Sequence, residues 1–278
     1  MDQPTVGLLH PGSMGAAVAA CAATNAAEVL WCEAGRSATS AARAAQFGLT
    51  PVVTLAELLD RSDIVISLCP PAAAEDLAHG VARHSFAGTY VEANAISPER
   101  AKRIAGLLGP AAAVVDGAVV GSPPVHGKTP TLYLSGPTAA TITVEEVFAG
   151  TAVRTKVLGT KVGQASALKL SYTAFQKASR ALAALATGMA RQYDVDQELL
   201  EVAARRSTSY LGEPEYIAKV AARAWRWGPE LEEAADTLAA AGLPPEMLRA
   251  AASTLARWHD AKDCELTLAD ALDHLAQP

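Results

Sequence analysis

The stretch Thr5-Val6-Gly7-Leu8-Leu9-His10-Pro11-Gly12-Ser13-Met14-Gly15 decides the fold, because it runs from an apolar strand through a glycine turn into a helix start. The N–H groups of such a helix start point at an anion, and the glycines let the backbone approach it closely, as a dinucleotide diphosphate requires. The usual pattern is G-x-G-x-x-G, and here His10 replaces its first glycine. An ordinary strand-to-helix turn is the alternative. We predict that the diphosphate is bound by His10, Pro11, Gly12, Ser13, Met14 and Gly15.

The rest of the chain favours the dinucleotide interpretation. From Val6 to about Leu158, β-rich runs alternate with helical runs across short connections. Ile64–Leu68 is apolar on both faces, which is typical of a parallel strand covered by helices on each side. The expected strands are Val6–His10, Glu28–Cys32, Pro51–Val53, Ile64–Leu68, Thr89–Glu92, Ala113–Val120, Leu132–Ser135 and Val153–Leu158. This alternation predicts an α/β fold, a Rossmann-type doubly wound parallel sheet.

The strand signals stop after Gly159, where a long helical run, Val162–Gln192, begins and further helical runs follow. The sequence therefore predicts two domains. Residues 1–160 form the NAD(P)-binding domain, and residues 161–278 form an all-α domain.

Composition excludes several classes of partner. A net charge of −6 argues against nucleic acid, whose phosphates select for a basic face. The four cysteines are scattered without a C-x-x-C pair, so we expect free thiols in a reducing compartment and no metal site. No basic-then-apolar leader precedes Val6, and the apolar run near Ala181–Ala190 is too short to span a bilayer. We expect a cytoplasmic protein with a small-molecule substrate.

The end of the second strand carries two conflicting cofactor signals. Glu33 lies where a carboxylate commonly binds the adenosine ribose 2'-OH, which favours NAD(H). Arg36 and Ser37 follow at a helix start and suit a ribose 2'-phosphate. The alternative for Arg36 is a solvated helix residue. We favour NADP(H), with NAD(H) as the alternative.

Polar and small residues follow the later strands at the edge of the sheet where Rossmann-type proteins bind ligands. Leu68, Cys69 and Pro70 follow the fourth strand, and we expect them to contact the cofactor. Asn94 follows the fifth and could hold the nicotinamide amide or a substrate oxygen, although a turn-capping role is the commoner one for asparagine. Ser122 follows the sixth and offers a hydroxyl to a substrate.

Lys169 is a lysine among small and apolar residues near the start of the long helix. A packed stem with the ammonium in water is the ordinary interpretation. The functional one is a desolvated amine that exchanges a proton with a reacting group. Tyr172 lies one turn further along the same helix face.

Together these residues resemble the β-hydroxyacid dehydrogenase superfamily, which includes 6-phosphogluconate dehydrogenase, 3-hydroxyisobutyrate dehydrogenase, tartronate semialdehyde reductase and imine reductases. The glycine turn, Leu68 to Pro70, Glu92 to Pro98 and Asp116 to Ser122 resemble family segments in the same order. The run Ala224-Trp225-Arg226-Trp227 resembles a branch whose C-terminal domain has no assigned function.

The resemblance implies roles for several residues. Gly163 to Lys169 matches the segment of the family's catalytic lysine, so Lys169 takes the general acid/base role. The resemblance also implies a homodimer in which the partner's helical domain completes the active site. Trp225, Trp227 and Trp258 suit burial in that dimer, with ordinary core packing as the alternative, which we expect chiefly for Trp258.

Three positions depart from the family pattern. The substrate loop, serine-glycine-glycine in the family, reads Val120-Gly121-Ser122, and the asparagine three residues after the lysine is Tyr172. A serine and a threonine of the nicotinamide-side motif are Asn94 and Ala95. A short β-hydroxyacid substrate is therefore in doubt. The retained lysine favours a carbonyl/alcohol couple, since many imine reductases carry aspartate or tyrosine there, while Tyr172 keeps imine reduction open.

The sequence thus predicts an NAD(P)H-dependent oxidoreductase that transfers hydride to or from a small carbonyl or hydroxyacid-type substrate. The expected catalytic set is Lys169, Tyr172, Asn94 and Ser122. An imine reductase with the same cofactor is the first alternative. A non-catalytic dinucleotide-binding protein, suggested by His10 and the altered loop, is the second.

Overall fold

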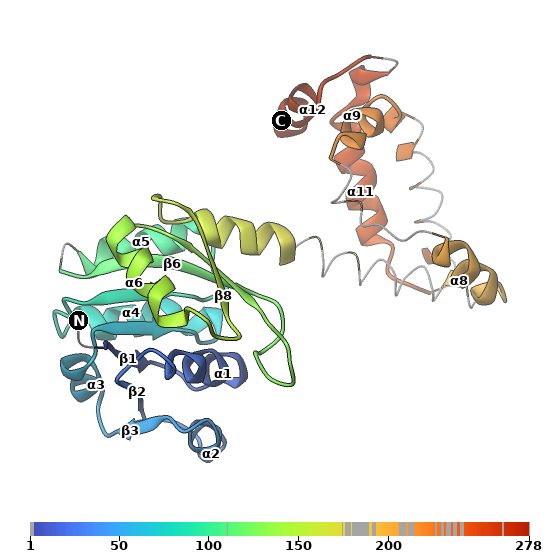
Figure 1. Cartoon of the computed structure of the whole chain (residues 1–278). Coiled ribbons are helices and arrows are strands. Elements are labelled where there is room, and N and C mark those ends of the chain that lie inside the picture. The colour runs from blue at the N-terminus through green and yellow to red at the C-terminus, as the bar shows by residue number, and fades with distance from the viewer. Residues whose placement is uncertain are drawn as a thin grey trace. The chain divides into compact units, whose positions relative to one another are not determined.

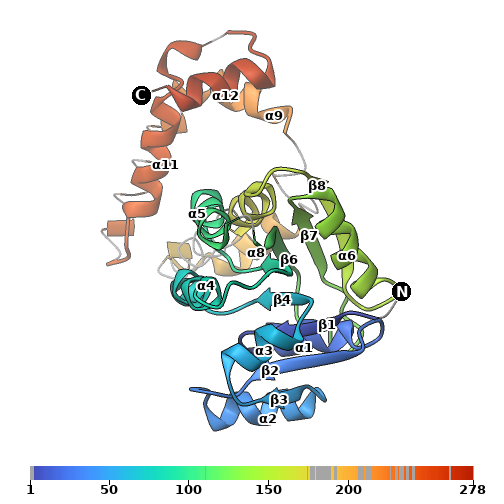
Figure 2. The same cartoon turned by 90° about the vertical axis from the view of Figure 1, so that its left-hand side faces the viewer.

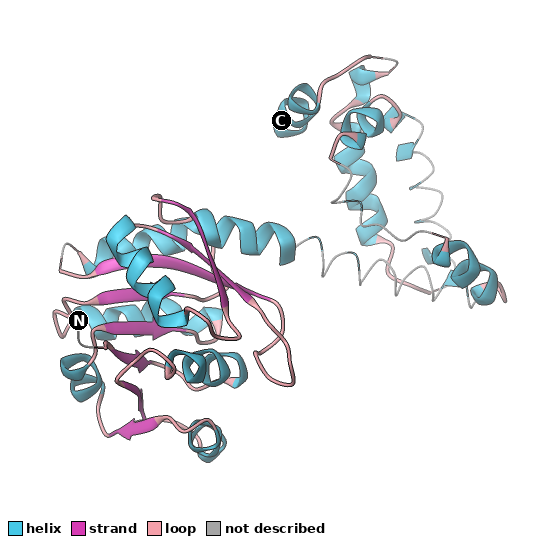
Figure 3. Ribbon diagram, in the orientation of Figure 1, coloured by secondary structure: helices cyan, strands magenta, loops and turns pink. Residues whose placement is uncertain are grey.

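The chain forms two compact units, Met1–Ala174 and Phe175–Pro278, which are considered separately below. The computed structural model describes residues 3–109, 111–173, 175, 179, 189–190, 193–205, 210, 214–225, 227–228, 231, 235, 238–239, 242–262 and 264–277. Figure 1 follows the chain from one end to the other, and Figure 3 colours it by secondary structure; every described strand belongs to the first unit.

The first unit is built on one eight-stranded sheet in the order β3-β2-β1-β4-β5-β6-β7-β8. Its first six strands are parallel to one another and have the doubly wound order of dinucleotide-binding folds. The strands are β1 (Thr5–Leu8), β2 (Glu28–Cys32), β3 (Thr50–Val52), β4 (Ile64–Ser67), β5 (Thr89–Glu92), β6 (Ala113–Val120), β7 (Thr131–Ser135) and β8 (Arg154–Gly159). The predicted fold class is confirmed, and the bounds of β2, β5 and β6 agree with the expected strands.

One strand departs from a purely parallel sheet. β7 runs antiparallel to β6, with Asp116 opposite Ser135 and Val120 opposite Thr131. Only residues 121–130 join these two strands, and so short a connection without a crossover helix returns the chain in the opposite direction. The helix α6 (Thr138–Phe148) then provides a crossover, and β8 lies parallel to β7.

Helices cover both faces of the sheet and bury two apolar layers. One layer contains residues of α1 (Ser13–Ala22), α2 (Ala38–Gln46) and α6, and the other contains residues of α3 (Leu55–Arg61), α4 (Ala74–Ala82) and α5 (Pro98–Leu108). A short 3-10 turn, η1 (Pro71–Ala73), precedes α4. Figure 2 shows α4 and α5 on one side of the sheet and α6 on the other. Strand residues alternate between the layers, so that Val91 faces the first and Tyr90 the second.

A buried carboxylate anchors the start of the long helix to this sheet. Asp116 of β6 is fully buried, and its Oδ2 accepts hydrogen bonds from the backbone N–H groups of Gly163 (2.8 Å) and Ser166 (3.0 Å). The hydroxyl of Ser166 donates to Asp116 Oδ1 (2.6 Å), and that of Ser135 donates to Oδ2 (3.1 Å). Residues 164–173 are helical, so the carboxylate satisfies the free donors of the first turn.

The second unit is helical where it is described. Its elements are α8 (Asp196–Ala204), α9 (Tyr216–Ala221), α11 (Glu246–Ala256), the 3-10 turn η3 (His259–Ala261) and α12 (Leu268–Ala276). Thr267 is the N-cap of α12, and its side chain and that of Asp270 form a capping box. Most of the later part of the expected helical run Val162–Gln192 lies outside the described residues.

A small core closes around Trp258, which is 5% exposed and donates its Nε1–H to the carbonyl oxygen of Ala271 (2.8 Å). Core packing of this tryptophan is confirmed. Trp225 is 48% exposed, and the Lys262 ammonium lies 4.4 Å from its ring centroid. Trp225 is thus not a core residue of the single chain, and its ring forms a cation–π contact.

We predict that Asp116→Asn lowers the free energy of unfolding by about 2–4 kcal/mol, because the amide NH₂ would face donors that now share a carboxylate. Urea denaturation measures the loss. Asp60→Asn, at an exposed position of α3, is the matched control and should change stability by less than about 0.5 kcal/mol. Equal stability of the two variants would contradict the anchoring role of Asp116.

Candidate functional site

The carboxyl ends of β1, β2, β4, β5 and β6 meet at one edge of the parallel sheet, and the predicted site residues follow these strands. The chain order reverses between β1 and β4, which is the place where doubly wound sheets bind ligands.

The glycine turn packs tightly between β1 and β4. A Cβ atom added to Gly15 would lie 2.7 Å from the carbonyl oxygen of His10 and 3.2 Å from that of Leu68, so only glycine fits there. Gly12 is the N-cap of α1, and no side chain of the described residues caps this helix. The N–H groups of its first turn are therefore left for a ligand such as a diphosphate.

His10 packs against this turn, contacts Arg36 and lies near the charge of Arg43. Its Nδ1 is 3.1 Å from Nη1 of Arg36, and Nη1 of Arg43 donates to the carbonyl oxygen of Pro11 (2.9 Å). Burial lowers the pKa of His10, and the charges of Arg36 and Arg43 lower it further. The imidazole is therefore neutral near pH 7 and accepts the hydrogen bond from Arg36.

A tight turn after β2 places Arg36 beside His10. The Arg36 N–H donates to the carbonyl oxygen of Glu33 (3.0 Å), and Gly35 adopts a left-handed φ of 71°. Glu33 is exposed, whereas Arg36 is half-buried and its Nε is buried without a hydrogen-bond partner. Ser37 is the N-cap of α2 and accepts from the Ser40 N–H (3.3 Å). The structure thus brings Arg36 to the glycine turn and leaves the Glu33 side chain in solvent.

Asn94 ties the ends of β4 and β5 together. Its Oδ1 accepts from the backbone N–H of Cys69 (2.5 Å), and its Nδ2 donates to Ser67 Oγ (2.9 Å) and to Glu92 Oε1 (2.5 Å). The side chain is 2% exposed, so its polar atoms face the protein interior. Cys69 is half-buried, and burial, followed by the nearby Glu92, raises its thiol pKa to about 11. The thiol is therefore protonated and weakly nucleophilic at neutral pH.

Glu92 is a buried carboxyl that was not among the predicted site residues. It is fully buried beside Tyr90 on the same face of β5, and its Oε2 has no hydrogen-bond partner. Burial raises the pKa of Glu92 to about 7; hydrogen bonds from Asn94 and the charge of Arg100 lower it, and Asp116 raises it. The sequence feature that could have singled out Glu92 is an acidic residue at the end of a buried strand.

Lys169 lies where the helical segment 164–173 passes the end of β6. Its Nζ donates to the carbonyl oxygen of Val119 (2.6 Å), one residue before β6 ends. The lysine is half-buried, Tyr172 is 40% exposed, and Ser122, just after β6, is exposed. The ammonium is thus held at the ligand-binding edge of the sheet, in the same unit as the glycine turn.

This fold and glycine turn define an NAD(P)-binding protein of the Rossmann class. The model of the NAD-binding domain of 6-phosphogluconate dehydrogenase matches residues 5–159, and the chain belongs to this family. A second model, of a domain of unknown function, matches residues 190–258. The superfamily resemblance, including the branch with an unassigned C-terminal domain, is confirmed.

One relative is similar to this chain over part of its length. An uncharacterized 28.5 kDa protein of Methanothermus fervidus is 30% identical over 175 residues, which span 63% of this chain and 66% of that protein, just under two thirds of its length.

Solved structures share the fold over nearly the whole chain. A reductive aminase from Aspergillus terreus in complex with NADPH and ethyl levulinate is 19% identical with a TM-score of 0.75, covering 99% of each chain. An imine reductase from Pseudomonas sp. is 20% identical with a TM-score of 0.71, covering 99% of this chain and 100% of that one. A conserved protein of unknown function, described as similar to 3-hydroxyacid dehydrogenases, is 24% identical with a TM-score of 0.60, covering 98% and 100%.

Within the described ranges, no three or more histidine, cysteine, aspartate or glutamate side chains gather in a way that could hold a metal ion. No helix in that part of the chain has the length and apolar character needed to cross a bilayer.

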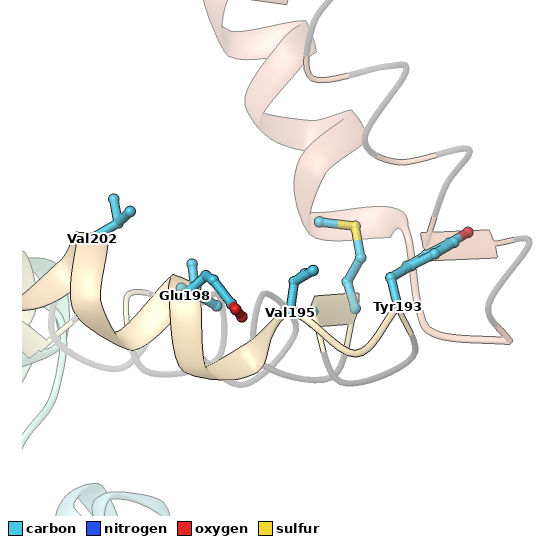
Figure 4. A pocket seen from close by; sticks show the side chains of 7 residues that line it. Tyr193, Val195, Glu198 and Val202 are labelled. Carbon is cyan, nitrogen blue, oxygen red and sulfur yellow. The ribbon is translucent and has the colours of Figure 1, made fainter.

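The helical unit carries an apolar hollow of about 470 Å³ at the start of α8. Figure 4 shows Val195, Glu198 and Val202 along this helix, with Tyr193 just before it. The full lining is Met189, Ala190, Tyr193, Val195, Glu198, Leu199 and Val202. Val195, Leu199 and Val202 follow the spacing of one helix face, and Val195 and Val202 are exposed.

We predict that Glu92→Gln stabilises the protein at pH 8 but not at acid pH. The pKa rises from 4.5 to about 7, so the folded protein binds the proton more tightly than the unfolded chain does. The free energy of unfolding of the wild type therefore falls as the pH rises from 4.5 through about 7. One pKa unit corresponds to about 1.4 kcal/mol, so the whole loss is about 3 kcal/mol at most.

Urea denaturation between pH 8 and pH 5 measures this difference. The advantage of Glu92→Gln should shrink as the pH falls through the window between 7 and 4.5. Glu146→Gln, at an exposed position of α6, should show no such trend. A pH-independent difference at position 92 would show that Glu92 does not titrate there.

Proposed function

We propose that this protein is an NAD(P)H-dependent oxidoreductase that transfers hydride to or from a small carbonyl or hydroxyacid-type substrate. The observation that carries the proposal is the place of Lys169: its ammonium is fixed at the end of β6, on the sheet edge that also presents the glycine turn. A proton-transfer group and a dinucleotide cradle at one edge are what such a reaction needs.

The residues of the cradle fit a bound dinucleotide. The first turn of α1 offers backbone N–H groups to the diphosphate, and Gly15 lets α1 approach β1 and β4. Arg36, whose Nε is buried and unpartnered, supports NADP(H) as the favoured cofactor, with Ser37 beside it and NAD(H) as the alternative. When bound, the nicotinamide supplies or accepts the hydride.

Lys169 supplies the proton in this proposal. The hydrogen bond to Val119 holds its Nζ at the end of β6, and an ammonium at this edge would donate to a substrate oxygen as charge develops there. Ser122, exposed after β6, would orient the substrate, and Tyr172 would be a second proton donor. Asn94 acts in this scheme by fixing the Cys69 end of β4 through its hydrogen bonds.

Imine reduction is the second candidate. It is supported by the structural similarity to imine reductases and to a reductive aminase, and by Tyr172, which is 40% exposed one turn after Lys169. The same residues would then protonate a nitrogen instead of an oxygen.

We predict that Lys169→Ala lowers turnover by about 100-fold or more, because general acid/base catalysis contributes roughly that factor. The cofactor dissociation constant should change by less than about 3-fold, since the lysine lies outside the cradle. Lys161→Ala, at an exposed position of the same segment, is the matched control. The assay follows NADPH oxidation with ketoacids, semialdehydes and cyclic imines.

The panel also separates the candidates. Turnover of the carbonyl compounds supports the first, and turnover of cyclic imines alone supports the second. Tight NADPH binding without oxidation of any compound would support a non-catalytic dinucleotide-binding protein. Unchanged turnover in Lys169→Ala would reject the assigned role.

We further propose that residues 1–160 bind the cofactor and that residues 161–278 form a dimerisation and substrate domain, whose partner copy completes the active site. Val195 at the N-cap of α8 and Val202 within the helix are both exposed, and they support an apolar face that another chain covers. The cysteines, all four of them free thiols, support the cytoplasm as the compartment.

We predict that the wild type sediments as a homodimer and that Val202→Glu shifts it toward the monomer. In a two-fold contact the introduced carboxylates would be desolvated and close to each other. Glu201→Gln, at the neighbouring exposed position of α8, should leave the mass unchanged. Analytical ultracentrifugation measures both, and a monomeric wild type would contradict the proposal.

A further inference from the structure

His10 occupies the position of the first glycine in the cofactor turn, and its ring packs against that turn. A Cβ atom added to Gly12 would lie 3.3 Å from Cδ2 and 3.5 Å from Nε2 of the imidazole. The His10 carbonyl oxygen accepts the Gly12 N–H (2.9 Å), so the backbone of the turn stays closed despite the larger side chain. The imidazole is therefore part of the surface that a diphosphate would meet.

The contact with Arg36 fixes the protonation of the ring. A guanidinium has only donors, so Nδ1 of His10 must be the acceptor in the 3.1 Å contact with Arg36 Nη1. The ring proton of the neutral imidazole then resides on Nε2, on the side of Gly12. The lowered pKa of His10 agrees with this neutral state.

Two features hold the Arg36 side chain near the turn: the turn at Gly35 folds the backbone back, and the imidazole accepts one Nη1–H. The Nε–H is buried and finds no hydrogen-bond partner among the described residues. Arg43 lies on the same side, where it donates to Pro11. In the described part of the chain, neither guanidinium has a carboxylate within ion-pair distance. Two arginines without a counter-ion beside a diphosphate cradle form a site for a further anionic group.

We propose that His10 determines cofactor specificity, because its neutral ring holds the Arg36 guanidinium over the glycine turn, where the guanidinium binds the phosphate on the adenosine ribose of NADP(H). This inference rests on the proposed function and adds a residue to it. His10 acts here through Arg36 and is a positioning residue. The substitution of the motif glycine thus serves selection between the two nicotinamide cofactors.

The opposite interpretation is steric. An imidazole over the turn could crowd the diphosphate and weaken both cofactors equally. The two interpretations predict opposite changes in cofactor affinity when His10 is removed. Relief of crowding improves the binding of both cofactors, whereas loss of the Arg36 contact selectively weakens the binding of NADPH.

The experiment measures the dissociation constants of NADPH and NADH by fluorescence titration, without turnover. The variants are His10→Ala, His10→Asn, Arg36→Ala and the double variant His10→Ala/Arg36→Ala. Asparagine is the conservative replacement, because its Oδ1 can accept the Arg36 hydrogen bond that alanine cannot. Circular dichroism confirms that each variant is folded.

We expect His10→Ala to raise the NADPH dissociation constant about 10-fold and that of NADH less than about 3-fold. His10→Asn should restore most of the preference. The double variant should bind NADPH no more weakly than Arg36→Ala alone, since the two residues act as one unit. A merely structural role would weaken both cofactors together and give no such coupling.

Failure of the inference on His10 can be distinguished from failure of the proposed function. If the wild type prefers NADPH but His10→Ala keeps that preference, or binds both cofactors more tightly, the inference is overturned and the proposed function stands. If the wild type binds neither cofactor, the proposed function itself fails. A wild type that prefers NADH overturns the inference and leaves an NAD(H)-dependent enzyme.

Discussion

The buried carboxylate of Asp116 is the interaction on which the site depends. Four donors from β7 and from the helix start converge on its two oxygens, and the Ser135 hydroxyl in turn accepts the N–H of Ala165. Lys169 lies three residues, about one turn, after Ser166 on the same helical segment. The hydrogen bonds of Asp116 therefore fix the position of the helical segment, and with it the position of Lys169 beside the end of β6.

The burial of Asp116 also affects the neighbouring strand β5, which carries a second buried carboxyl group. Glu92 of β5 is the direct strand partner of Asp116 of β6, so two carboxyl groups lie side by side on one face of the sheet. Asp116 has four donors, whereas Glu92 has only Asn94, on one oxygen. Burial raises the pKa of Glu92, the group with fewer hydrogen bonds, to about 7. The edge of the sheet is thus ordered by two buried acids with unlike environments.

Sequence predicted the frame of the site because strand ends are visible as the points where apolar runs stop. β5 and β6 were placed with their bounds, and Lys169 stood out in an apolar helix. The pairing of side chains was not predictable in this way. Nothing local in the sequence shows that Asp116 reaches Ser166, fifty residues later, or that the hydrogen bonds of Asn94 are directed inward to Ser67 and Glu92. These contacts follow from strand register, which only the folded sheet supplies.

The glycine turn, Arg36 and Lys169 all belong to the first unit, where the sheet fixes the distances between them. The hydrogen bonds of Asp116 and Lys169 also lie within this unit. The lysine is therefore held at the end of β6 by contacts that do not involve the helical unit, and its place relative to the glycine turn follows from the sheet alone.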